Sequence, residues 1–196
     1  MSELERLLHC VISCFEALGL EYAVMGGLAV RVHAIPRPTY DADFILAIDR
    51  NQLPRLFESV QEIGLTVAPP YLSGWVDKVA EMPLVKFRAY VAEETGIDVD
   101  VFLAETDFQR NVIQNRMGVE VNGKSIQVVT AEDLLLLKLL ASRPRDLIDV
   151  ADLIFIQGEL DSAYLRRWAT SLGIIDRLEA AFKMESGGEA SGNEHE

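Results

Sequence analysis

The sequence has little cysteine and little histidine, the two residue types that most often bind zinc. Of its 196 residues, two are cysteine and three are histidine. These residues form no ligand cluster along the chain, so a structural zinc site is not expected. Cys10 and Cys14 lie four residues apart in a stretch with helical periodicity. We interpret them as core thiols rather than as a disulfide or a metal pair.

Long apolar runs are also missing. No run reaches the roughly 18 residues that a membrane-spanning helix needs. The first residues, MSELERLL, predict an acidic amphipathic helix and contain neither the basic nor the apolar region of a secretory signal. We therefore expect a cytoplasmic protein with no membrane partner.

Positive charge is in the minority. The chain has 18 Lys and Arg against 31 Asp and Glu, which gives a net charge of −13. This balance argues against a protein that coats nucleic acid through a broad basic face, although it allows a local basic groove. Hydrophobic residues make up 49% of the chain, which indicates a packed core.

The order of predicted elements indicates an α+β fold. Residues 1–129 mix strands and helices and predict a mixed sheet flanked by helices. Residues 130–184 read as a C-terminal helical segment packed on this core. Residues 185–196, ESGGEASGNEHE, are small and acidic, and we expect them to be a disordered tail.

One stretch near the N-terminus combines features of a phosphate site. Tyr22–Met25 predicts a strand, Gly26 and Gly27 a turn, and Leu28–Ile35 a short helix. Glycines allow a phosphate to approach the backbone closely, and the N–H groups that open a helix favour an anion. A plain structural turn is the alternative interpretation.

Two acidic residues follow this stretch. Asp41 and Asp43 are two residues apart at the start of the predicted strand Asp43–Ile48, so their side chains share a face. Neighbouring carboxylates repel each other and need a cation or a shared proton. Near a phosphate-binding turn, they suit Mg²⁺ bound between the protein and nucleotide phosphates. A solvated acidic pair is the alternative.

A third acid is available on a later strand. In Ile97–Leu103 the apolar residues alternate with Asp98 and Asp100, which therefore share the opposite face. Either one could complete a metal site or act as a general base. The alternative is an edge strand with one wet, acidic face.

A basic residue interrupts the most apolar predicted helix, Ala131–Ala141. Lys138 lies among leucines and needs a carboxylate or a phosphate as its partner, unless it extends to the surface. Pro144 breaks this helix. Asp146 and Asp149 come at the start of the next helix, where helix capping and surface salt bridges are the simplest explanation.

These motifs together resemble the AbiEii/MNT-like nucleotidyltransferases of the polymerase-β superfamily, over about residues 22–152. That family includes toxins of toxin–antitoxin and phage-defence systems. Its last motif is Arg-x-Lys-Asp-x-x-Asp, and this chain has Arg145 in place of the lysine. The matching residues are Gly26-Gly27, Arg37, Thr39, Asp41-Ala42-Asp43, Asp100 (Asp98 as the alternative), and Arg143 to Asp149.

The resemblance implies a nucleotidyltransferase-type fold and a metal-dependent transfer of NMP from an NTP such as ATP. Asp41, Asp43 and Asp100, with Asp98 as the alternative, would be the catalytic carboxylates that hold Mg²⁺ or Mn²⁺. Nucleotide binding would fall to the glycine turn and the basic motifs. These residues are Gly26, Gly27, Arg37, Thr39, Lys138, Arg143 and Asp146.

The acceptor stays open at this point. A tRNA end, a protein hydroxyl or a small molecule would each fit, and an antitoxin protein is an expected partner if the chain is a toxin. Two other functions are consistent with the same motifs. One is an aminoglycoside- or lincosamide-type antibiotic nucleotidyltransferase, and the other is a catalytically silent binding module.

Overall fold

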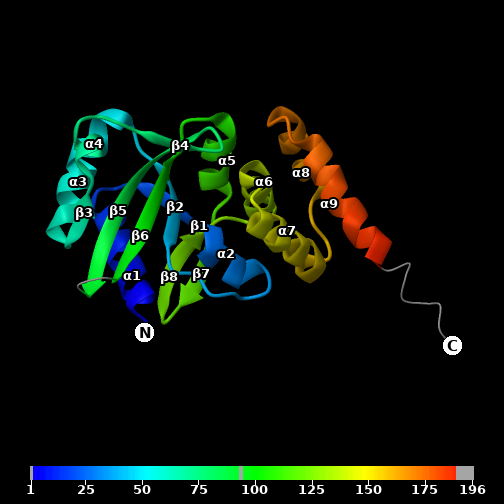
Figure 1. The fold of residues 1–196 in the computed structure, drawn as a ribbon, viewed down its shortest axis with the longest axis horizontal. Coiled ribbons are helices and arrows are strands. Elements are labelled where there is room, and N and C mark those ends of the chain that lie inside the picture. The colour runs from blue at the N-terminus through cyan, green and yellow to red at the C-terminus, as the bar shows by residue number, and fades with distance from the viewer. Residues whose placement is uncertain (1, 93–94, 189–196) are drawn as a thin grey trace. The chain divides into compact units, whose positions relative to one another are not determined.

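A computed structural model describes residues 2–92 and 95–188 of the chain (Figure 1). The chain divides into two compact units. The first contains Met1–Ala29 and Pro38–Val129, and the second contains Val30–Arg37 and Thr130–Glu196. The second unit therefore combines the C-terminal helices with a short segment from early in the chain. The predicted fold class, a mixed sheet flanked by helices, is confirmed.

The sheet of the first unit has eight described strands. Seven follow the order β3-β5-β6-β2-β1-β8-β7, and the eighth, β4, pairs with β5. The pairs β2/β6 and β1/β8 are parallel, and the other pairs are antiparallel. The strands are β1 (Glu21–Met25), β2 (Ala42–Ala47), β3 (Leu65–Val67), β4 (Asp77–Val79), β5 (Met82–Ala92), β6 (Thr95–Leu103), β7 (Met117–Val121) and β8 (Lys124–Val128).

Local signals in the sequence explain many of the helix ends. Ser2 and Glu5 form a capping box, and Thr130 caps the helix that follows it. The helices are α1 (Glu3–Ala17), α2 (Gly26–His33), the 3₁₀ turn η1 (Arg50–Gln52), α3 (Leu53–Glu62), α4 (Pro69–Leu72), α5 (Asp107–Asn115), α6 (Ala131–Ala141), α7 (Pro144–Gln157), α8 (Ser162–Ser171) and α9 (Ile175–Gly188).

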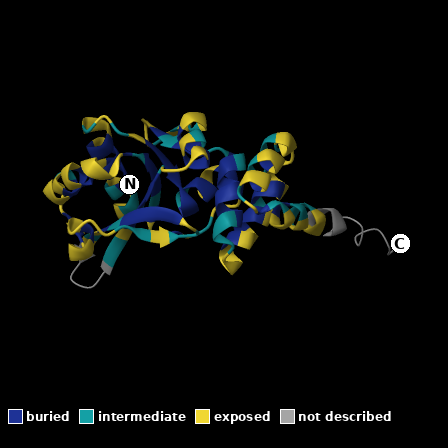
Figure 2. Ribbon diagram, turned by 90° about the horizontal axis from the view of Figure 1, so that it is seen from above, coloured by how far each residue is buried: buried dark blue, intermediate teal, exposed yellow. Residues whose placement is uncertain are grey.

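The two faces of the sheet differ in character. Phe15 of α1 packs edge-on against Phe44 of β2, and Phe57 of α3 packs in the same way against Phe87 of β5. The helices α1 and α3 therefore cover one face, whose strand residues are buried (Figure 2). Because side chains alternate along a strand, residues next to these phenylalanines, such as Asp43 and Lys86, project from the opposite face.

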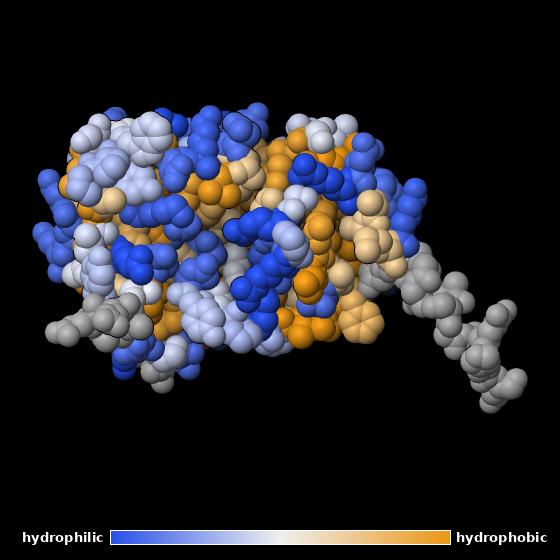
Figure 3. Space-filling view, viewed as in Figure 1, coloured by the Kyte–Doolittle hydropathy of each residue, from blue (hydrophilic) through white to orange (hydrophobic). Residues whose placement is uncertain are grey.

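The second unit is built on α6, which packs against α7 and α8. Its leucines are buried almost all round the helix, as expected for a helix inside a core. Helix α7 is more one-sided and leaves several large apolar residues exposed. Apolar side chains also gather on the surface over α6 and α7 (Figure 3). The exposed residues of α7 are Leu147, Ile148, Phe155 and Ile156.

Several details differ from expectation. The sequence predicts that this strand begins at Ile97, but β6 begins at Thr95, where pairing with β5 extends it. Cys14 is buried but Cys10, one helical turn earlier, is exposed. Of the expected tail, Glu185–Gly188 continues helix α9, and residues 189–196 lie outside the described residues. Within the described part, no helix has the length and apolar composition to cross a membrane.

Candidate active site

The junction between β1 and α2 brings backbone and carboxylate unusually close together. Helix α2 begins directly at Gly26, with no separate turn, and Gly26 has φ +63°. A Cβ atom added to Gly26 would lie 1.9 Å from Oδ2 of Asp43. Only glycine therefore allows the Asp43 carboxylate to lie against the start of α2, where the helix dipole favours negative charge.

A row of charged residues crosses three strands beside this junction. Asp43 of β2 is in register with Asp100 of β6, and Asp100 is in register with Lys86 of β5. Residues in register project from the same face, so the two carboxylates and the lysine lie side by side. Strand β6 is interior to the sheet, which excludes the alternative of a wet edge strand.

The Asp100 carboxylate has two different environments. Its Oδ2 accepts a hydrogen bond from Lys86 Nζ at 2.8 Å. Its Oδ1 is buried and has no hydrogen-bond partner among the described residues. Burial by itself lowers the pKa of Lys86, but the hydrogen bond and charge of Asp100 outweigh burial, and the pKa of Lys86 is raised. Lys86 therefore stays charged at neutral pH.

The other predicted acids of this unit lie near the row but have partners of their own. Asp41 is exposed, and its Oδ1 accepts a hydrogen bond from Thr39 Oγ1 at 2.6 Å. Asp98 is paired with Arg88 at 3.5 Å, and both side chains are about half exposed (56% and 49%). The register and burial of Asp100 make it a better neighbour of Asp43 than Asp98 is.

The carboxylates of Asp43 and Asp100 are suitable ligands for a divalent cation, although they do not form a complete ligand set. Within residues 2–92 and 95–188, no group of three or more His, Cys, Asp or Glu is arranged to hold a metal. Oxygen ligands of Asp43 and Asp100 suit Mg²⁺ or Mn²⁺, and Oδ1 of Asp100 is a buried acceptor without a donor among the described residues.

The second unit contains a different charged group, the ion network of Arg37, Lys138, Arg143, Asp146 and Asp149. Lys138 Nζ lies 3.0 Å from Asp146 Oδ1 and 2.7 Å from Asp149 Oδ2. The guanidinium of Arg37 binds both oxygens of Asp149, at 2.6 and 2.8 Å. Arg143 Nε lies 2.6 Å from Asp146 Oδ2. Three cations thus surround two carboxylates.

The carboxylates of the ion network are fully buried, with side chains 2% and 1% exposed at Asp146 and Asp149. They are therefore not the surface salt bridges that seemed the simplest explanation. Burial by itself raises the pKa of each, but hydrogen bonds and charge outweigh it. The bonds from Arg143 and Lys138 hold the pKa of Asp146 low, and those from Arg37 and Lys138 hold that of Asp149 low. Lys138 is buried with carboxylate partners and does not reach the surface.

The model of one protein family matches residues 13–172, described as the nucleotidyl transferase AbiEii toxin of a type IV toxin–antitoxin system. The match covers most of the chain. The protein belongs to the AbiEii nucleotidyltransferase family. The predicted family and the prediction of an enzyme that transfers nucleotidyl groups are thereby confirmed.

Comparison with solved structures shows a nucleotidyltransferase-like fold. An antigenic nucleotidyltransferase-like protein from Paracoccidioides brasiliensis is 19% identical, with 93% of this chain and 94% of that chain covered and a TM-score of 0.52. The lincosamide antibiotic adenylyltransferase LnuA is 18% identical, with 80% and 98% covered and a TM-score of 0.48. Among curated proteins, none matches the chain.

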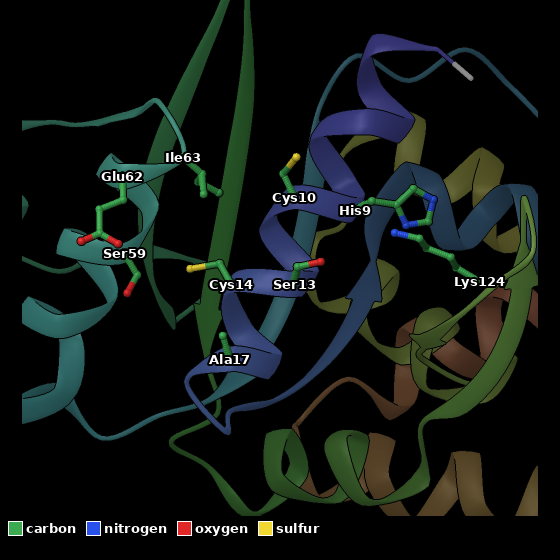
Figure 4. A pocket seen from close by; sticks show the side chains of 9 residues that line it. All are labelled: His9, Cys10, Ser13, Cys14, Ala17, Ser59, Glu62, Ile63 and Lys124. Atoms are coloured by element: carbon green, nitrogen blue, oxygen red, sulfur yellow. The ribbon is translucent and has the colours of Figure 1, made fainter.

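Two cavities of this AbiEii protein lie in the first unit. One, of about 410 Å³, is lined by α1, α3 and Lys124 (Figure 4). There the Cys14 side chain points toward Ser59, while that of Cys10 points in another direction. Burial raises the pKa of the Cys14 thiol. The other cavity, of about 560 Å³, is lined by residues such as Phe57, Tyr71 and Leu72. Asp41, Asp43 and Asp100 line neither cavity.

Two residues of these sites were not among the predicted functional residues. Lys86 could have been found, because Lys86 and Arg88 alternate along β5 just as Asp98 and Asp100 alternate along β6. Asp149 belongs to the family motif and was interpreted as a capping or salt-bridge residue, without a functional role. Its spacing of three from Asp146 puts both carboxylates on one side of α7, which was the available signal.

Proposed function

We propose that this AbiEii-family chain transfers NMP from an NTP to an acceptor hydroxyl with the help of Mg²⁺ or Mn²⁺. The observation that supports this most is that Asp43 and Asp100 are in register on one face of the sheet, and that the buried Oδ1 of Asp100 has no hydrogen-bond partner among the described residues. A bound divalent ion would supply charge neutralisation for the phosphates and the leaving oxygen.

In this proposal each residue has a definite task. Asp43, Asp41 and Asp100 hold the metal, with Asp100 rather than Asp98 as the third acid. Asp100 is also the candidate acceptor of the proton from the attacking hydroxyl. The backbone at Gly26 and Gly27 binds the triphosphate, because these glycines open α2 and lack side chains that would keep a phosphate away. Thr39 fixes the Asp41 carboxylate.

The proposed phosphate contacts in the second unit are Arg37, Lys138 and Arg143, with Asp146 as an indirect contributor. The guanidinium of Arg143 is the strongest candidate, since its side chain is 69% exposed although it also binds Asp146. Arg37 and Lys138 are more deeply involved with Asp149. We propose that they mainly hold the ion network in shape.

The test is incubation of the purified protein with each labelled NTP in turn, Mg²⁺ or Mn²⁺, and a cell extract. We expect label in a macromolecule or small molecule with the wild type and its loss with Asp43→Asn. Asp107→Asn is the matched control, since the Asp107 side chain is 90% exposed and pairs only locally with Arg110. No transfer by the wild type with any NTP would overturn the proposal.

Digestion of the product identifies the acceptor. Label released by ribonuclease indicates an RNA end, label released by protease indicates a protein, and label on a supplied aminoglycoside or lincosamide indicates an antibiotic. The family description also supports a toxin role, with an antitoxin as partner. Expression of the wild type should then slow growth, and expression of Asp43→Asn should not. Equal growth of both strains would remove the toxin role.

A further inference from the structure

Lys86 already occupies one side of the carboxylate that the proposed metal would use. Its Nζ lies 2.8 Å from Asp100 Oδ2, and the two side chains are 42% and 20% exposed. Lys86 is in register with Asp100, which is in register with Asp43. The lysine therefore lies on the far side of Asp100 from Asp43, where it binds Oδ2 and leaves the buried Oδ1 without a hydrogen-bond partner among the described residues.

A second ion pair on the same two strands, Arg88 and Asp98, differs from the pair of Lys86 and Asp100 in distance and burial. Arg88 and Asp98 are also in register on β5 and β6, but their closest approach is 3.5 Å and both side chains are more exposed. An exposed ion pair has little effect on neighbouring charges, because solvent screens it. The distance between Lys86 and Asp100 is shorter, and both side chains are better buried. The charge of Lys86 therefore acts more strongly on an ion that binds beside Asp100.

We propose that the positive charge of Lys86 weakens metal binding when no nucleotide is bound. Metal binding would therefore depend on the nucleotide. This inference rests on the proposed function. Without nucleotide, the charge of Lys86 offsets the repulsion between Asp43 and Asp100 and repels a divalent ion that shares the Asp100 carboxylate. The negative triphosphate of an NTP outweighs this single positive charge, so metal and nucleotide bind together.

Lys86 acts through Asp100 and is a positioning residue rather than a catalytic one. Its charge and its hydrogen bond can be separated by substitution. Lys86→Met removes both but keeps an unbranched side chain, Lys86→Gln removes the charge but keeps a donor, and Lys86→Arg keeps the charge. Arg88→Met is the matched control, since it removes a cation from the same face of the same strand.

The experiment measures Mn²⁺ binding by the electron paramagnetic resonance signal of free Mn²⁺, with and without a non-hydrolysable NTP analogue. Without nucleotide, we expect Lys86→Met and Lys86→Gln to bind Mn²⁺ about tenfold more tightly than the wild type, as removal of a nearby cation requires. Lys86→Arg and Arg88→Met should stay within about twofold of the wild type. With the analogue, the difference between wild type and Lys86→Met should shrink.

A purely structural role for Lys86 predicts the opposite sign, because a disordered Asp100 would bind Mn²⁺ more weakly. Unchanged or weaker Mn²⁺ binding by folded Lys86→Gln therefore overturns the inference, and thermal unfolding verifies that each variant is folded. If the wild type transfers NMP but Lys86→Gln binds Mn²⁺ unchanged, only the role of Lys86 fails. If no variant binds Mn²⁺ with or without nucleotide, the proposed function fails as well.

Discussion

Asp43 and Asp100 in the first unit, and Asp146 and Asp149 in the second, are two carboxylate pairs that differ in how their charge is compensated. In the second pair every carboxylate oxygen has a cationic partner, supplied by Arg37, Lys138 or Arg143. In the first pair, Asp100 has Lys86 on one oxygen and no hydrogen-bond partner, among the described residues, on the other.

The difference indicates different roles. A buried carboxylate whose oxygens all have partners contributes to a fixed internal structure and has no acceptor left for a ligand. A carboxylate with a buried, unpartnered oxygen is in an unfavourable state that an added cation would relieve. This difference is consistent with the proposed metal binding by the first pair and with a structural role for the second. The following predictions test this division.

The largest effect is expected from breaking the ion network. Asp149→Ala leaves Arg37 and Lys138 without their shared partner, and the Lys138 side chain is only 7% exposed. Loss of one member of a buried ion pair typically destabilises a protein by about 3–5 kcal/mol. Chemical denaturation followed by circular dichroism measures the free energy of unfolding. A loss below about 1 kcal/mol, the range of surface pairs, would show that the network is not structurally important.

A somewhat smaller loss is expected from Gly26→Ala. Alanine is strained at φ +63°, and its Cβ would lie 2.6 Å from Asp43 Cγ and 2.8 Å from Asp43 Cβ as well as close to Oδ2. Strain and overpacking together should cost about 2–4 kcal/mol. The displaced Asp43 carboxylate should also abolish nucleotidyl transfer.

Gly19→Ala is the matched control for the Gly26 variant. Gly19 has a similar φ of +68°, but nothing lies within 4 Å of an added Cβ. This variant should lose only about 1–2 kcal/mol from backbone strain and should retain activity. Equal losses of stability and activity in both variants would contradict a specific approach of Asp43 to Gly26.

The third prediction separates Asp100 from Asp98. Asp100→Asn removes the proposed metal ligand and should lower the rate of NMP transfer by about 100-fold or more. Asp98→Asn changes only a half-exposed pair with Arg88 and should leave the rate within about twofold. Initial rates with labelled NTP give both values. The reverse order would make Asp98 the third acid.

The smallest expected effect is the pH dependence of the free energy of unfolding that the ion network contributes. The pKa values of Asp146 and Asp149 are lower in the folded protein than in the unfolded chain. In the unfolded chain their pKa is about 4, and above this pH their contribution to stability is fully present. The contribution is lost as the pH falls through their lower pKa in the folded protein. The free energy of unfolding, measured by denaturation between neutral and acidic pH, should fall in this range. It should fall less steeply in Asp149→Asn, and identical slopes would contradict the assignment.

Much of the local structure could be predicted from the sequence. The capping box of Ser2 and Glu5, the cap at Thr130 and the hairpin turn at Asn122-Gly123 depend on residues within a few positions of each other. The hairpin turn has positive φ at both residues, as a type I′ turn requires. The start of α2 differs from the prediction, since the sequence indicates a glycine turn and the helix begins at Gly26 itself.

The candidate site was predicted less completely, because its key relations join distant strands. Alternation along β6 predicted that Asp98 and Asp100 share a face, but it could not choose between them. The choice depends on the register with β2, where Asp100 rather than Asp98 is opposite Asp43. The partner of Lys138 was likewise left open between a carboxylate and a phosphate, and packing of α6 against α7 supplies the carboxylates.

The sequence by itself determined the periodicities, the caps, the glycines before α2 and the placement of acids on alternating strand positions, since these follow from neighbouring residues. Only the tertiary structure decided that Asp100 has one satisfied and one unsatisfied oxygen, and that Arg37 binds Asp149, 112 residues away. Charge compensation depends on which side chains meet across strands and helices, and burial makes those contacts strong enough to separate a structural carboxylate from one that can bind an ion.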